Sequence, residues 1–340
     1  MTTQSLPSRK EPWTVTGLLS RVSGMNTVWI TVALFAEIVV FAACLPTGTF
    51  VSVYNLQTIL SDAAVLLILA TAATLVIVAG GIDLSLGSTL TLSAVCAARV
   101  MRIVAPESEV LAICAGALAG VAVGAVVGAF NGYLIAYRRL PSFVVTLGSL
   151  GIALGIARLT SGGVGVSGLP ESIRGFGQGY RLGIPLPFLI GLAVIIVFWF
   201  VLELTRFGEH TYFIGSNSEA ATRGGINVPR HAMGLYTIAG GLAGFAGLVD
   251  FARFQVASVA TGHITELIAA IAAVVIGGGS LFGGIGSLKG TFVGVFIPII
   301  LANGLLIGGI ERFWQDVITG FILILAVWFD QWRRTSDVAR

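Results

Sequence analysis

Apolar residues follow one another in long blocks, separated by short polar or glycine-rich stretches. A helix needs about 20 apolar residues to cross the hydrocarbon core of a bilayer. Blocks of about that length predict helices near residues 27–45, 62–80, 85–101, 110–137, 143–160, 185–204, 232–250, 266–277, 289–309 and 315–332. We therefore expect an all-α integral membrane protein, a polytopic bundle of about ten transmembrane helices.

Two of these blocks, 85–101 and 266–277, are short and interrupted by glycine, which predicts broken or re-entrant helices. The stretch LVIVAGGIDLSLGS (75–88) also resembles AAVVIGGGSLFGGIGS (272–287). Glycine-broken segments in matching halves point to a transport path, although glycine also simply lets helices pack closely. The candidate hinge residues are Gly80, Gly81, Gly87, Gly278, Gly279, Gly283 and Gly284.

Composition supports a membrane location. Of 340 residues, 56% are hydrophobic and 10% are charged, whereas soluble chains average about 45–50% and about 25%. The net charge of +3 is small and the basic residues are scattered, so nothing suggests a nucleic-acid binder. The three cysteines lie in apolar stretches without metal-like spacing.

Lysine and arginine near span ends predict the orientation, because they concentrate on the cytosolic side. With a cytosolic N-terminus they divide 12 inside to 7 outside, which accounts for all 19. The expected domains are a cytosolic tail (1–26), retained rather than cleaved as a signal peptide, a transmembrane domain (27–332) and a cytosolic C-terminal tail (333–340). Residues 161–184 then form an extracytoplasmic loop and 205–231 a cytosolic one.

A few polar residues interrupt the apolar blocks. Asp83, in GGIDLS beside Ser85, is costly in a bilayer and could mark a path or gate; it could equally cap the following helix at a turn. The other candidates for a lining are Asn131, Thr146, Glu266 and Asn303. For each of these the alternative is a hydrogen bond between helices that touches no substrate.

The segment SEAATRGGINVP (218–229) predicts a short cytosolic helix, capped at Ser218 and broken at Gly224 and Gly225. Such a helix has too few apolar residues to fold alone. It therefore favours docking into a partner protein slightly over an ordinary solvated loop helix.

No motif indicates catalysis or a bound cofactor. The chain lacks the glycine-rich phosphate loop that ends in Gly-Lys-Ser/Thr, so ATP and Mg²⁺ would have to be bound by a partner. None of the three histidines has a carboxylate or cysteine at metal-ligand spacing. A membrane enzyme is therefore disfavoured, and we expect no catalytic, metal or cofactor-binding residues.

Three long motifs occur in order: GGIDLSLGS (80–88), EAATRGGINV (219–228) and IAAVVIGGGSLFGGIGSLKGT (271–291). Together with NGYLIAYRRLPSFVVTLGSL (131–150) and NGL (303–305), they resemble the ribose-type permeases of bacterial ABC importers.

This resemblance implies a subunit of a monosaccharide or polyol importer in the bacterial inner membrane. Its partners would be a second permease subunit, a cytosolic ABC ATPase and an extracytoplasmic sugar-binding protein. The coupling helix would comprise Glu219, Ala220, Ala221, Thr222 and Arg223, followed by Gly224 and Gly225.

The expected mechanism is alternating access, in which the glycine breaks let the bundle switch between inward-open and outward-open packings. Two alternatives remain at this stage. An ion-coupled secondary transporter also uses glycine-broken helices around polar residues, and ABC permeases for branched-chain amino acids share part of this pattern.

Overall fold

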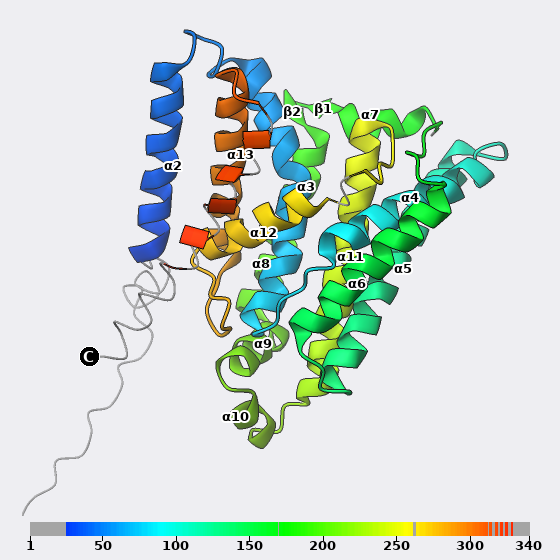
Figure 1. Cartoon of the computed structure of the whole chain (residues 1–340), viewed down its shortest axis with the longest axis vertical. Coiled ribbons are helices and arrows are strands. Elements are labelled where there is room, and N and C mark those ends of the chain that lie inside the picture. Colours follow the sequence, from blue (N-terminus) through cyan, green and yellow to red (C-terminus); the bar gives the residue numbers. More distant parts are fainter. Residues whose placement is uncertain are drawn as a thin grey trace, which may run out of the picture.

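The structure, a computed structural model, describes residues 25–168, 170–260 and 263–311 together with scattered positions between 313 and 328. It is a helical bundle with one small β-hairpin (Figure 1). Its elements are α2 (Met25–Cys44), α3 (Val53–Val78), α4 (Leu86–Val104), α5 (Glu109–Ala136), α6 (Ser142–Ser161), α7 (Ser172–Gln178), β1 (Tyr180–Arg181), β2 (Ile184–Pro185), α8 (Leu186–Leu204), α9 (Arg206–Ser216), α10 (Ser218–Arg223), α11 (Val228–Phe254), α12 (Ile264–Ile276) and α13 (Leu288–Ile307).

Within the described residues, seven helices are long and apolar enough to cross a membrane: α3, α4, α5, α6, α8, α11 and α13. This confirms an all-α membrane protein but not the expected count of about ten spans. Helix α12 has 13 residues and so reaches only about 20 Å, short of the roughly 30 Å hydrocarbon core. The expected tails and most of the last expected span (315–332) lie outside the described residues.

Helix α3 runs through the middle of the bundle, and every residue from 63 to 78 is buried. It begins at Val53, nine residues before the start expected at 62, because its polar first turns have partners. The Asn55 side chain pairs with Asn303 of α13, and Gln57 donates to the Gly183 carbonyl oxygen. Pairing of this kind lets polar residues begin a helix that the apolar pattern alone would start later.

Helices α5 and α11 pack closely through glycine. On α5, glycines recur every fourth residue along the buried face, at Gly116, Gly120, Gly124, Gly128 and Gly132. A β-carbon on Gly124 would lie 2.2 Å from the carbonyl oxygen of Gly240 on α11. Small residues let helix backbones approach in this way. Inside lipid the hydrophobic effect does not drive helices together, so the van der Waals contacts of this close approach stabilise the pair instead.

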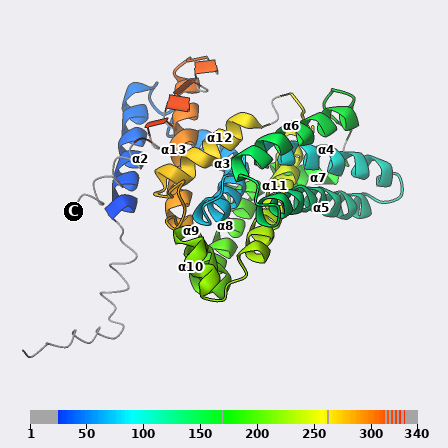
Figure 2. The same ribbon diagram turned by 60° about the horizontal axis from the view of Figure 1, so that its bottom comes forward.

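The helices form two groups on either side of α3 (Figures 1 and 2). Helices α2 and α13 lie together at one edge, while α4, α5 and α6 form the opposite one. At one end of the bundle lie α9 and α10; at the other lie α7 and the hairpin of β1 and β2. The segment 161–184 thus contains a short helix and an antiparallel strand pair.

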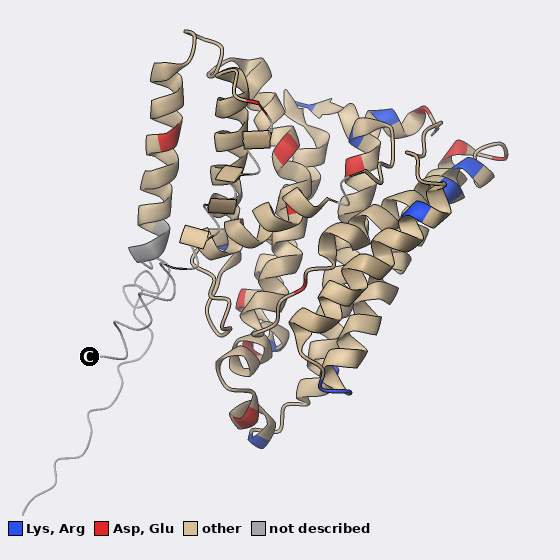
Figure 3. Ribbon diagram, in the orientation of Figure 1, with Lys and Arg blue, Asp and Glu red and all other residues tan. Residues whose placement is uncertain are grey.

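Charged residues are sparse along the bundle, and lysine and arginine gather mainly toward its two ends (Figure 3). The hydrocarbon core disfavours unpaired charge, so this distribution fits helices that cross it. Helix α10 and the loop that contains the hairpin therefore lie at opposite ends of the bundle (Figure 1).

Candidate functional site

The chain between α3 and α4 turns inside the bundle, and Asp83 is only 4% exposed there. The residue that precedes α4 is Ser85, so Asp83 is not the helix cap. Asp83 Oδ1 instead accepts hydrogen bonds from the Ser85 backbone N–H (2.8 Å) and from Ser85 Oγ (2.6 Å). The carboxylate thus orders the turn that leads into α4.

Three of the expected path residues meet beside this turn. Asn131 of α5 donates from Nδ2 to Ser85 Oγ at 2.9 Å, and Ser149 Oγ of α6 donates to Asn131 Oδ1. Asp83, Ser85, Asn131 and Ser149 are all buried. This chain of hydrogen bonds joins α4, α5 and α6 to the turn after α3.

Thr146 lies on the other side of the same turn. Its hydroxyl bonds to the Ser142 carbonyl oxygen at 2.9 Å and contacts the Ile82 carbonyl oxygen at 3.3 Å. The Ile82 backbone N–H points to Ser142 Oγ at 3.4 Å. The first turns of α6 therefore hold the segment 82–85 in place through contacts with Ile82.

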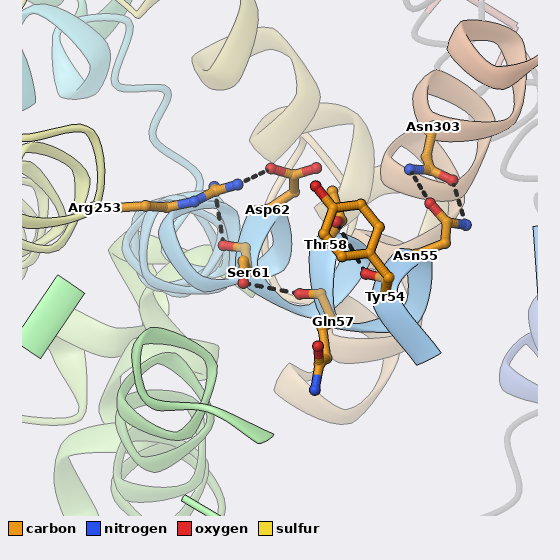
Figure 4. A network of polar contacts seen from close by, with 8 residues as sticks. All are labelled: Tyr54, Asn55, Gln57, Thr58, Ser61, Asp62, Arg253 and Asn303. Carbon is orange, nitrogen blue, oxygen red and sulfur yellow. Dashed lines mark hydrogen bonds and ion pairs between the residues drawn. The ribbon is translucent and has the colours of Figure 1, made fainter. Parts of the chain in front are cut away.

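The two remaining candidates lie elsewhere. Asn303 forms a reciprocal pair of amide hydrogen bonds with Asn55, both at 2.9 Å, near the start of α3 (Figure 4). Along the same stretch of α3, Arg253 of α11 forms an ion pair with Asp62 and donates to the Ser61 carbonyl oxygen. Asn303 thus belongs to a cross-link between α3 and α13.

Glu266 lies in the first turn of α12, near a buried polar cluster that the sequence analysis missed. His263 Nε2 lies 3.1 Å from Asp250 Oδ2, and His263 Nδ1 lies 2.9 Å from Thr91 Oγ1. These three residues come from the start of α12, from α11 and from α4. Nothing local marks them, because 172 positions separate Thr91 from His263 along the chain.

The two glycine-broken segments contact each other at a point that we name the glycine junction, formed by Gly80, Gly215, Gly283 and Gly284. A β-carbon on Gly283 would lie 2.7 Å from Gly80 Cα and 2.8 Å from the Gly215 carbonyl oxygen. The Gly284 backbone N–H donates to the Val78 carbonyl oxygen at 2.9 Å. Gly215, which the sequence alone did not single out, belongs to α9.

The expected hinge glycines differ in their surroundings. The end of α3 turns at Gly80 with φ +82°, and the turn after α12 has φ +86° at Gly278, a region that side chains disfavour. Gly81 lies beneath the Tyr236 hydroxyl, where a β-carbon would approach to 2.4 Å, and Gly279 lies against Val274. Gly87 differs from these because it is an ordinary residue inside α4.

Helix α9 has further links to its surroundings. The Tyr212 hydroxyl donates to the Gly286 carbonyl oxygen at 2.8 Å, and Thr211 Oγ1 lies 2.8 Å from His231 Nε2 at the start of α11. Burial raises the pKa of Tyr212 to about 12, and the negative charge of Glu203 adds to this rise. A tyrosine hydroxyl is already protonated at neutral pH, and this rise in pKa keeps the Tyr212 hydroxyl a donor into alkaline solution as well.

A cavity of about 260 Å³ lies beside the glycine junction. Its walls include Gly80 and Gly81, Ser142 of α6, Tyr236 of α11 and Ser218 of α10. It therefore separates the first residue of α10 from the turn that carries Asp83.

Helix α10 presents most of its surface to solvent. Its cap is Asn217, whose side chain accepts from the Ala220 backbone N–H at 2.9 Å, and not Ser218 as expected. Ala221 is 6% exposed and packs inward, whereas Glu219 and Arg223 form an exposed pair at 3.5 Å. Gly225, at φ +87°, ends the helix near the predicted position. Such an exposed helix offers a surface for another protein.

The comparisons with known proteins bear on this arrangement. Residues 55–327 match the family described as branched-chain amino acid transport system, permease component. The ribose import permease protein of Escherichia coli (strain K12) is 36% identical over 334 residues, 97% of this chain and 99% of the relative. The chain belongs to this family of import permeases. It is therefore a transport component and not an enzyme.

Other relatives act on different sugars. The galactose/methyl galactoside import permease protein of Haemophilus influenzae is 36% identical, over 83% of this chain and 88% of the relative. The fructose import permease protein of Rhizobium meliloti is 35% identical, over 84% and 80%. No solved structure matches the chain. The fold described above thus places the glycine junction and α10 in an import permease.

Proposed function

We propose that this chain is the membrane-spanning subunit of an ATP-driven ABC importer for a monosaccharide or polyol. The similarity to ribose, galactose and fructose import permeases over most of the chain supports this substrate class. ATP is hydrolysed by a partner, and this subunit supplies the route across the inner membrane of a bacterium.

The observation that carries the mechanism is the contact of Gly215 with both glycine-broken segments. Helices α9 and α10 are consecutive, so a push on α10 reaches Gly215 through a few residues of helix. Gly215 in turn contacts the end of α3 at Gly80 and the segment after α12 at Gly283. Interfaces packed this closely switch between discrete arrangements instead of deforming continuously, which suits alternating access.

The partners follow from the two faces of the bundle. Helix α10, with Glu219 through Arg223 and the following Gly224 and Gly225, docks into a cytosolic ABC ATPase. The opposite face, with α7 and the hairpin of β1 and β2, receives an extracytoplasmic sugar-binding protein. A second permease subunit completes the path, and both termini are cytosolic.

The remaining spans complete this topology. In the proposed bundle the seven long helices, α2 and the short α12 are nine membrane segments, and the expected span 315–332, most of which lies outside the described residues, is the tenth. Helix α12 spans the hydrocarbon core only in part, and in the proposed topology the glycine-rich segment 277–287 that follows it completes the passage to the cytosolic side. Its polar neighbours Asp250, His263 and Thr91 are paired with one another, which offsets the cost of polar groups at membrane depth.

The chief alternative substrate is a branched-chain amino acid, because the matching family carries that description. The sugar assignment is favoured because the relatives that align with most of the chain import sugars. An ion-coupled secondary transporter is disfavoured by membership of a family of transport-system components.

Transport in proteoliposomes tests the proposal. The chain is reconstituted with the ATPase and the binding protein encoded by neighbouring genes, and uptake of labelled ribose, galactose, fructose and leucine is measured. We expect uptake of one sugar only when ATP reaches the ATPase. Uptake of leucine alone, or uptake driven by an ion gradient without the ATPase, would contradict it.

A further inference from the structure

A second hollow lies on the side of the bundle, between α8 and the first turns of α13. It has a volume of about 290 Å³ and is lined by Leu192, Ile195, Ile196, Trp199, Leu288, Lys289 and Phe292. Six of these seven side chains are apolar or aromatic, and Lys289 is the only charged one. On α8 beside it, Val197 and Phe200 are 55% and 48% exposed. The hollow thus opens onto an apolar surface.

Lys289 has no carboxylate partner among the residues that the structure describes. Its ammonium nitrogen lies 4.7 Å from the centre of the Trp199 ring instead. A cation–π contact holds the position of an ammonium group without neutralising its charge. The Trp199 indole N–H is buried and also lacks a hydrogen-bond partner within the described part of the chain. An unneutralised ammonium group, held by an aromatic ring, therefore lies in an otherwise apolar groove.

The depth of this end matches the boundary between lipid headgroups and acyl chains. Trp199 lies five residues before Leu204, the last residue of α8, which corresponds to about 7.5 Å along the helix axis. Tryptophan and lysine concentrate at this level of membrane proteins because each joins an apolar body to a polar tip. In the orientation proposed above, this is the cytosolic leaflet, where anionic lipids create a negative potential.

A second copy of the chain fits this groove poorly. In a two-fold symmetric dimer with the groove on its axis, the groove faces its own counterpart, so two unneutralised Lys289 side chains would approach one another. An anionic phospholipid offers the opposite arrangement: its phosphate meets Lys289, which the Trp199 ring holds in place, while an acyl chain covers the apolar wall formed by Leu192, Ile195 and Ile196.

We infer that the groove between α8 and α13 binds an anionic phospholipid through Lys289 and Trp199. The lipid would cover one side of the first turns of α13, the helix that directly follows the glycine-broken segment. Its occupancy would therefore stabilise the start of α13 next to the glycine junction. This inference concerns lipid binding alone and stands whichever solute the importer carries.

Lipid titration of the purified full-length chain in detergent tests the inference. Phosphatidylglycerol is added while the thermal melting midpoint is followed, with phosphatidylcholine and inorganic phosphate as comparisons. We expect phosphatidylglycerol to raise the midpoint, and the other two to have little effect. One lysine near a membrane surface contributes about 1 kcal/mol to the binding of anionic lipid. Lys289→Gln should therefore raise the phosphatidylglycerol concentration needed for half-saturation about five-fold.

Two further variants separate charge from folding. Lys289→Arg keeps the charge and should titrate like the unmodified chain, and Arg138→Gln removes a charge that lies over Tyr133 at the end of α5. Equal titration of Lys289→Gln and Arg138→Gln would overturn the inference, as would equal stabilisation by phosphatidylcholine or by phosphate. A changed monomer–dimer equilibrium in Lys289→Gln with unchanged lipid titration would assign the groove to a second copy instead.

Quenching of tryptophan fluorescence tests the same groove without changing Lys289. Phosphatidylglycerol with brominated acyl chains quenches nearby tryptophan fluorescence. The chain has six tryptophans, and Trp199→Phe should remove a saturable part of the quenching. Unchanged saturable quenching in Trp199→Phe would contradict binding at this groove.

Discussion

Gly80 and Gly283 lie in direct backbone contact, although each belongs to a different glycine-broken segment. A β-carbon on Gly283 would stand 2.7 Å from Gly80 Cα. The sequence showed these segments as two similar stretches, and the structure shows that they touch. Gly215 of α9 lies against both, so one contact point connects α9 with two turns of the bundle.

Replacing Gly283 with alanine should destabilise the chain and impair transport. Gly283 has φ +85°, a region that costs a side chain about 1–3 kcal/mol, and the added methyl group has no space. Thermal melting in detergent should show the loss. The matched control is Gly148→Ala on α6, where nothing lies within 4 Å and the midpoint should stay equal or rise. Equal midpoints for both variants would contradict the tight junction.

Asn131 should act through packing between helices and not through contact with substrate. Its side chain is fully buried and joins Ser85 to Ser149. Asn131→Ala should therefore lower stability by about 0.5–2 kcal/mol, while the KM for the transported sugar stays unchanged. Melting and uptake kinetics measured on the same preparation decide this. A raised KM with an unchanged melting midpoint would place Asn131 in the path instead.

The reciprocal amide pair between Asn55 and Asn303 should couple α3 to α13. Either single replacement by alanine leaves the partner amide buried without its hydrogen bonds, whereas the double replacement removes both groups. A double-mutant cycle of melting stabilities should give a coupling of about 1 kcal/mol. Strictly additive losses would show that the pair contributes nothing beyond its two separate side chains.

Glu219 and Arg223 should matter for coupling and not for folding. Their side chains are 83% and 82% exposed, and exposed ion pairs add little to stability. The combined variant Glu219→Gln with Arg223→Gln should insert and melt like the parent chain but lose most ATP-driven uptake. Arg230→Gln, an exposed change a few residues further on, serves as control and should transport normally. Normal uptake by the combined variant would refute docking of α10.

Several features could be read from single stretches of sequence. Asp83 and Ser85 follow a long apolar block, so their place at a turn between helices was predictable, as was the break after Arg223 at Gly224 and Gly225. The roles of Asn131 and Asn303 were not. Both interrupt apolar blocks in the same way, yet Asn131 meets the Asp83 turn and Asn303 pairs with Asn55 at the far end of α3.

The sequence by itself determined that lipid surrounds these helices, where most of them run, and which family the motifs resemble, because apolar length and contiguous motifs are local properties. Only the tertiary structure decided which polar groups meet, since 248 positions separate Asn55 from Asn303. It likewise decided that Gly215 touches Gly80 and Gly283. Such contacts depend on how whole helices cross, and close packing of small residues, which no single helix specifies, fixes that geometry.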